Sequence, residues 1–140
     1  MNSGAPTRNI VQRIFGIPAT SKPADPDCWS YNQGMLNIDL EKAPELQARG
    51  GAIRLEGGDL PLRVLVFCDM EGSYHALHNR CTHMGHRRLD PWPEKATVHC
   101  CSVSKSTYDL KGNNISGPAP GPIRTFSVTA EEGRLRIRLE

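Results

Sequence analysis

Residues 68–101 read CDMEGSYHALHNRCTHMGHRRLDPWPEKATVHCC, and this stretch decides the fold. It holds all five histidines and four of the five cysteines of the chain. Cys81 and His83 lie two positions apart, an arrangement that a loop can direct at one metal centre. The pair Cys100-Cys101 follows after a loop rich in proline, arginine and aspartate. Two separated groups of soft ligands are typical of Cys/His metal sites, so the sequence predicts a metal centre built from two loops.

Three motifs in order extend this pattern toward the C-terminus. Cys81-Thr82-His83-Met84-Gly85 matches a Cys-x-His-x-Gly loop, and seventeen residues separate His83 from Cys101. Residues 101–109, CSVSKSTYD, align with Cys-Pro-x-His-Gly-x-x-Phe-Asp, and residues 116–120, SGPAP, form a proline-rich loop. With these motifs the chain resembles the Rieske iron–sulfur family over roughly residues 34–140.

The resemblance implies a fold and a set of site residues. It implies antiparallel sheets as a base, with a smaller loop-bearing part at about residues 79–109 that holds a [2Fe–2S] cluster. Cys81 and Cys101 would bind one iron, and His83 would bind the other. The proline loop, with Gly117, Pro118 and Pro120, would cover the cluster and limit its contact with solvent.

One departure from the family pattern changes the expected site. The position of the second ligand histidine is Ser104, and the glycine position after it is Lys105. Three hypotheses follow. In the first, a cluster forms with Ser104, Cys100, His86 or a water as the fourth ligand. In the second, the remaining ligands hold a single metal ion with one open position. In the third, the site holds no metal and the fold serves as an accessory subunit.

The rest of the chain predicts an all-β sandwich or barrel. Eleven prolines and thirteen glycines interrupt every helical apolar period, and turn signals occur about every ten residues. In residues 134–139, Leu135, Ile137 and Leu139 alternate with arginines, as on a strand with one buried face. The predicted strands are residues 62–68, 74–79, 96–100, 123–129 and 134–139.

Residues 1–33 differ from the remainder and are interpreted as an N-terminal arm. Asn9 is the predicted cap of a short helix that ends near Gly16, and a proline-rich polar stretch follows. The arm either folds over its own domain or docks on a partner subunit, which makes self-association one of the expectations.

Composition and charge exclude several function classes. A 140-residue chain with 38% hydrophobic residues forms one domain, and a net charge of +2 is not the footprint of a nucleic-acid binder. No apolar run approaches the length of a membrane span, and no secretory signal is visible, so we expect a cytoplasmic protein. In that reducing compartment, cysteines indicate metal ligands or free thiols before disulfides.

The sequence therefore predicts a soluble electron-transfer protein, or the electron-transfer subunit of a larger redox enzyme, that acts through a protein partner. The alternative is a cluster-free or mononuclear-metal accessory subunit. Cys28, Cys68 and Cys100 are interpreted as structural thiols, and His99 as a histidine that packs locally. The arginines that flank the first loop, Arg80, Arg87 and Arg88, are either solvated charges or a rim for an anion or an acidic partner.

Overall fold

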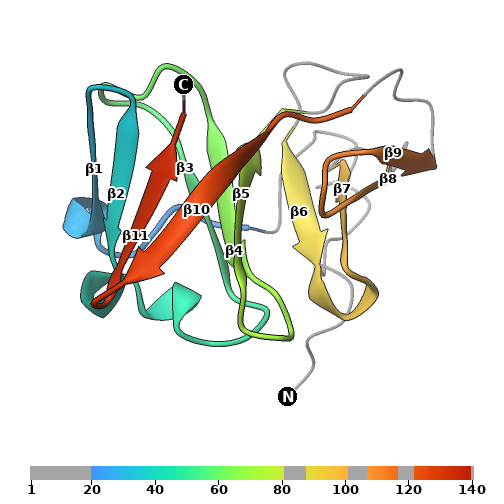
Figure 1. Ribbon diagram of the computed structural model, residues 1–140, viewed down its shortest axis with the longest axis horizontal. Coiled ribbons are helices and arrows are strands. Elements are labelled where there is room, and N and C mark those ends of the chain that lie inside the picture. Colours follow the sequence, from blue (N-terminus) through green and yellow to red (C-terminus); the bar gives the residue numbers. More distant parts are fainter. Residues whose placement is uncertain (1–19, 81–87, 101–106, 117–121, 140) are drawn as a thin grey trace.

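A computed structural model describes residues 20–80, 88–100, 107–116 and 122–139 as two antiparallel sheets (Figure 1). The larger sheet has seven strands in the order β1-β2-β11-β10-β5-β4-β3, and the smaller has four in the order β6-β7-β8-β9. The all-β antiparallel class predicted from the sequence is confirmed. No described helix has the length and hydropathy of a membrane-spanning segment.

The strands of the large sheet are β1 (Trp29–Asn32), β2 (Met35–Asp39), β3 (Ala52–Leu55), β4 (Val64–Cys68), β5 (Tyr74–His78), β10 (Thr125–Glu131) and β11 (Arg134–Arg138). Those of the small sheet are β6 (Leu89–Trp92), β7 (Thr97–Cys100), β8 (Thr107–Asp109) and β9 (Asn114–Ser116). Four short 3-10 helices lie between strands: η1 (Pro26–Cys28), η2 (Leu40–Lys42), η3 (Pro44–Leu46) and η4 (Pro93–Lys95).

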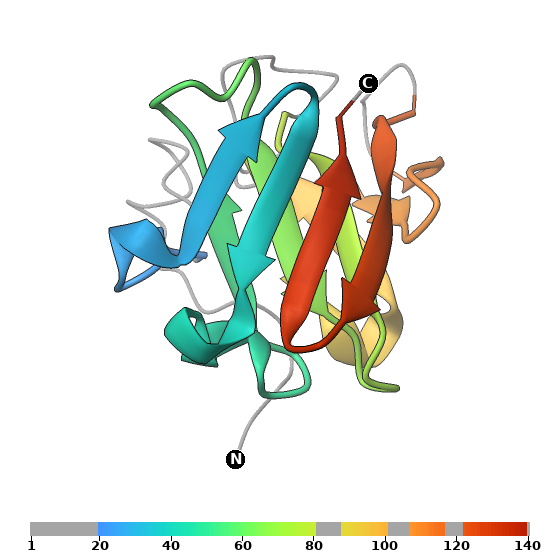
Figure 2. The ribbon, with the colours of Figure 1, turned by 60° about the vertical axis from the view of Figure 1, so that its left-hand side comes forward.

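The large sheet curls around its own hydrophobic core. Figure 2 shows β1, β2, β11 and β10 in front of β3, β4 and β5, with the core between the two halves. On β11, Leu135 and Ile137 are buried while the arginines between them are exposed, which confirms the alternation predicted from the sequence. Leu36 and Ile38 of β2 face the same core.

Strand β4 is buried on both faces because it separates two cores. Val64 and Val66 pack into the core of the large sheet. Leu65 and Phe67 point the other way, into a second core that the large sheet shares with the small one. A strand covered on both sides requires a continuous apolar run, and residues 64–68, VLVFC, supply it. The second core contains Leu65, Phe67, Leu77, Leu89, Val98, Cys100, Tyr108 and Ile123.

All five strands predicted from the sequence are present, each with bounds within two residues of the prediction. The structure adds β1, which lies inside the segment assigned to the N-terminal arm and pairs with β2. Gln33 and Gly34 connect the two strands with φ of 50° and 81°, a left-handed pair suited to a tight hairpin. The sheet therefore begins at Trp29, and the expected helix near residues 9–16 lies outside the described residues.

Candidate functional site

The structure describes the strands that carry the predicted site rather than its ligands. Most of the predicted site residues lie outside the described ranges: Cys81, His83, His86, Cys101, Ser104, Gly117, Pro118 and Pro120. Cys100 is described, as the last residue of β7. Among the described residues, no group of three or more His, Cys, Asp or Glu side chains is arranged to hold a metal ion.

The strand ends bring the three predicted loops to one end of the small sheet. Residues 81–87 lead into β6, whose first residue Leu89 pairs with Cys100, the last residue of β7. Residues 101–106 connect β7 to β8, where His99 pairs with Thr107. Thr107 in turn pairs with Ser116, the first residue of the proline loop. Because neighbouring strands are antiparallel, all three motifs start or finish at the same end of this sheet.

Asn79 holds together the two ends of the first loop. Its side-chain Oδ1 accepts a hydrogen bond of 2.7 Å from the backbone N–H of Leu89, ten positions further along the chain. Its own N–H donates to the carbonyl of Arg63 at 2.9 Å. Both Asn79 and Leu89 are fully buried. The sequence analysis did not identify Asn79, since a single asparagine between a strand and a loop carries no distinctive pattern.

Replacing Asn79 with alanine leaves the buried N–H of Leu89 without its acceptor. An unsatisfied buried donor costs about 2 kcal/mol, so we expect the free energy of unfolding to fall by that amount. Urea denaturation measures it. Asn37→Ala is the matched control, because the Asn37 side chain makes no hydrogen bond to another described residue and its loss should cost less than about 0.5 kcal/mol. Equal losses in the two variants would show that the Asn79 bond does not stabilise the loop.

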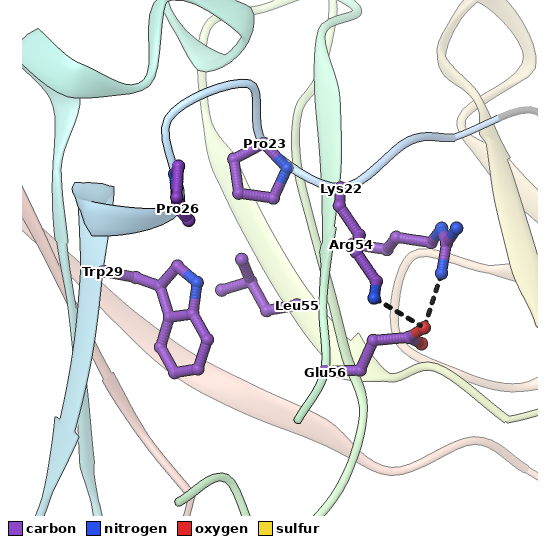
Figure 3. A pocket seen from close by; sticks show the side chains of 7 residues that line it. All are labelled: Lys22, Pro23, Pro26, Trp29, Arg54, Leu55 and Glu56. Carbon is purple, nitrogen blue, oxygen red and sulfur yellow. Dashed lines mark hydrogen bonds and ion pairs between the residues drawn. The ribbon is translucent and has the colours of Figure 1, made fainter. Parts of the chain in front are cut away.

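A group of charged side chains around Glu56 holds Arg88, the residue that follows the first loop. Arg88, the residue before β6, donates to both carboxylate oxygens, Nε to Oε2 at 2.8 Å and Nη2 to Oε1 at 3.0 Å. Arg54 Nη1 donates to Oε1 at 2.5 Å, and Lys22 Nζ lies 4.0 Å from the same oxygen. Figure 3 shows Lys22 and Arg54 converging on this carboxylate. Glu56 thus connects the small sheet to the segment that follows β3.

The Glu56 carboxyl is held ionised by these partners. Burial raises its pKa, but the hydrogen bond and charge of Arg88, with the charges of Arg54 and Lys22, outweigh burial and place the pKa below its ordinary value of 4.5. A lowered pKa in the folded state means that the stabilisation is fully present above pH 4.5 and is lost as the pH falls through the folded-state value.

Glu56→Gln should therefore destabilise the protein in a pH-dependent way. We expect a loss of about 1–2 kcal/mol at pH 7, which shrinks toward zero as the pH falls below 4.5 and the wild-type carboxylate becomes protonated. Chemical denaturation at a series of pH values checks this. Glu71→Gln, on the exposed turn after β4, is the control and should change the free energy of unfolding at pH 7 by less than about 0.5 kcal/mol. A difference in the free energy of unfolding between wild type and Glu56→Gln that stays constant across the pH series would contradict this explanation.

The start of the described chain lies against both sheets. The N–H of Thr20 donates to the Asp90 carboxylate on β6 at 2.8 Å, and the carbonyl of Thr20 accepts from Arg54 Nε at 3.0 Å. Asp90 is fully buried and pairs across the strands with His99. The His99 ring stacks on Trp92, with centroids 5.1 Å apart and planes 3° from parallel. His99 therefore packs locally, as the sequence analysis interpreted it.

The described cysteines, Cys28, Cys68 and Cys100, are buried. Burial and the nearby Glu45 carboxylate raise the pKa of Cys28 to about 11, and burial and Asp69 raise the pKa of Cys68. Cys100 is fully buried in the second core. The burial of Cys28 and Cys68 agrees with the structural role that the sequence analysis gave them.

Comparison with known proteins identifies the family. Residues 38–127 match the family model of the Rieske [2Fe-2S] domain, a span that contains β3, β4, β5, the whole small sheet and all three loop motifs. The chain belongs to the Rieske [2Fe-2S] domain family.

Two curated relatives match half of the chain. The iron–sulfur subunit of the cytochrome b6-f complex of Chlorobaculum tepidum is 34% identical over 68 residues, 49% of this chain and 36% of that protein. The oxygenase subunit of glycine betaine monooxygenase of Chromohalobacter salexigens is 32% identical over 68 residues, 49% of this chain and 15% of that protein. The matched region is thus a minor part of either relative.

Solved structures support the fold. The ferredoxin of carbazole 1,9a-dioxygenase from Nocardioides aromaticivorans IC177 has a TM-score of 0.58 at 18% identity, over 69% of this chain and 93% of that one. At this identity the likeness shows a shared fold and nothing more. It confirms the Rieske-type architecture expected from the three motifs.

Proposed function

We propose that this chain is an electron-transfer protein, or the electron-transfer subunit of a larger redox enzyme, with a [2Fe–2S] cluster held by Cys81, His83 and Cys101. The observation that carries the proposal is that the strand ends next to the three motifs, at Leu89, Cys100, Thr107 and Ser116, all lie at one end of the small sheet. Family membership supports it, since the family is named for this cluster. When bound, such a cluster takes up and gives back one electron.

The donor set fits three of the four positions that the cluster needs. Two thiolates and one imidazole are retained, and Ser104 stands where the second histidine is expected. We assign the fourth position to the Ser104 hydroxyl in preference to Cys100. The support for this choice is that Cys100 is fully buried in the second core beside Leu89 and Tyr108.

The described residues would hold the ends of the loops in place. The Asn79 bond to Leu89 and the Glu56 bonds to Arg88 fix both sides of the first loop, and a loop anchored at both ends keeps its ligands in position when an electron arrives. The chemistry on a substrate would belong to a protein partner. Relatives that are subunits of an oxygenase and of a cytochrome complex support a role within a larger assembly. Free thiols at Cys28 and Cys68 support a reducing compartment such as the cytoplasm.

Ser104→His tests the ligand assignment. An alkoxide oxygen carries negative charge and favours the oxidised cluster, whereas imidazole is neutral. We expect the variant to raise the reduction potential by on the order of 100 mV and to shift the visible spectrum. Ser106→His, the same substitution two residues further on, is the control. Identical potentials and spectra in the wild type and Ser104→His would contradict the assignment.

A cluster-free interaction subunit is the second candidate function. The observation that favours it is the double change at Ser104 and Lys105, which removes a ligand and adds a charge in the same loop. Such a protein is colourless, so its visible spectrum separates it from the first candidate.

A further inference from the structure

A pocket of about 290 Å³ lies between the end of β5 and the segment that leads into β10. The described residues that line it are His78, Arg80, Pro122, Ile123 and Arg124, and none of these is acidic. The two sides are joined by a backbone hydrogen bond of 2.8 Å from the N–H of His78 to the carbonyl of Arg124. In Figure 1 this is the place where the chain crosses from the small sheet to β10, beside β5.

Arg124 is held in position before any ligand arrives. Its Nη2 donates to the carbonyl of Leu139 at 2.8 Å, and its guanidinium carbon lies 5.0 Å from the centre of the Phe126 ring. A guanidinium has five N–H donors, so these contacts leave donors for a ligand. A positioned arginine loses little side-chain entropy on binding, which favours affinity.

Arg80 stands on the opposite side of the pocket. It is exposed and makes no side-chain hydrogen bond or ion pair with another described residue. His78 lines the same pocket and is half-buried. Burial, followed by the charges of Arg80, Arg63 and Arg124, lowers the pKa of the His78 ring below 6.5. Two arginines, with no acidic side chain among the described lining residues, give the pocket a positive potential.

We propose that this pocket is a binding site for an oxyanion group, a carboxylate or a phosphate, held between Arg80 and Arg124. Guanidinium groups form paired, charge-assisted hydrogen bonds with such anions. A water molecule takes up about 30 Å³ in the liquid, so the pocket admits an anion of a few heavy atoms with water around it. The inference does not depend on a bound cluster, because every residue that carries it is described.

Isothermal titration calorimetry of the full chain at constant ionic strength tests the proposal, with inorganic phosphate in one series, acetate in a second and chloride in a third. We expect saturable binding of phosphate or acetate and none of chloride, and the anion that binds more tightly identifies the group recognised. Arg80→Gln should weaken binding at least tenfold, because it removes charge-assisted hydrogen bonds.

Arg136→Gln is the matched control, since it removes the same charge from an exposed position in the middle of β11 and should leave binding unchanged. Circular dichroism of each variant verifies folding. The proposal would be overturned if the three anions gave the same heats at equal ionic strength, or if the wild type and Arg80→Gln bound the anion equally. Either result would hold whether or not the protein contains iron.

Discussion

Replacing Cys81 or Cys101 with alanine should remove the iron from the protein. In the proposed site each thiolate is one of only two sulfur ligands that the chain supplies, and both would bind the same iron. Loss of either one leaves that iron with a single protein ligand, so we expect iron and sulfide to fall to less than about a tenth of the wild-type content. Chemical analysis of both variants, purified without oxygen, measures this.

Cys68→Ala is the matched control for these variants. Cys68 is a buried thiol at the end of β4, where it pairs with Tyr74. This is the end of β4 away from the candidate site, since Val64, at the other end, pairs with His78 near the first loop. We expect this variant to lose some stability but to retain its iron. Unchanged iron in both Cys81→Ala and Cys101→Ala would eliminate these two residues as ligands.

Gly112→Ala should be among the most destabilising single substitutions in the described part of the chain. Gly112 lies in the turn between β8 and β9 with φ of 89°, and its carbonyl accepts a hydrogen bond of 2.7 Å from the N–H of Ile123. A Cβ atom there would lie 2.1 Å from the carbonyl oxygen of Ile123, so the two segments would have to separate. We expect a loss of about 3 kcal/mol or more, measured by urea denaturation.

Gly57→Ala separates the steric clash from the cost of the left-handed backbone. Gly57 has φ of 88°, nearly the same as Gly112, but an added Cβ meets no atom within 4 Å. Its substitution should cost only about 1 kcal/mol, the strain of an L-residue in this conformation. If both variants lost the same free energy, the contact between the β8–β9 turn and Ile123 would contribute nothing to stability.

The strands that pack against large cores were predictable from the sequence. Residues 64–68 form an unbroken apolar run because β4 faces two cores, and residues 134–138 alternate because β11 faces one. The turn between β10 and β11 was also predictable from the sequence, because Glu132 and Gly133 stand between two strand patterns. In the structure both residues adopt positive φ.

Other strands lack such a signal for physical reasons. β6 contains Pro91, which argues against a central strand, but β6 is at the edge of the small sheet, where a missing N–H is tolerated. β8 and β9 span three residues each, too few for a period to be visible. β1 falls in the segment interpreted as the N-terminal arm because it has only four residues and follows a polar, proline-rich stretch; in the structure its Trp29 and Tyr31 pack against the core of the large sheet.

Only part of the candidate site was predictable from the sequence. Its expected ligands follow from three short motifs that keep their order and spacing, so the sequence alone nominates Cys81, His83 and Cys101. The contacts that anchor the first loop join Asn79 to Leu89 and Glu56 to Arg88, which are 10 and 32 positions apart. Such contacts depend on how the two sheets pack together, and no local pattern encodes them.

The most direct test of the central claim is the iron and acid-labile sulfide content of the full chain purified without oxygen, together with its visible spectrum. The account predicts about two iron atoms and two sulfides per chain and a brown protein whose visible absorption falls when it is reduced. Metal without sulfide, or a colourless protein with neither, would contradict it.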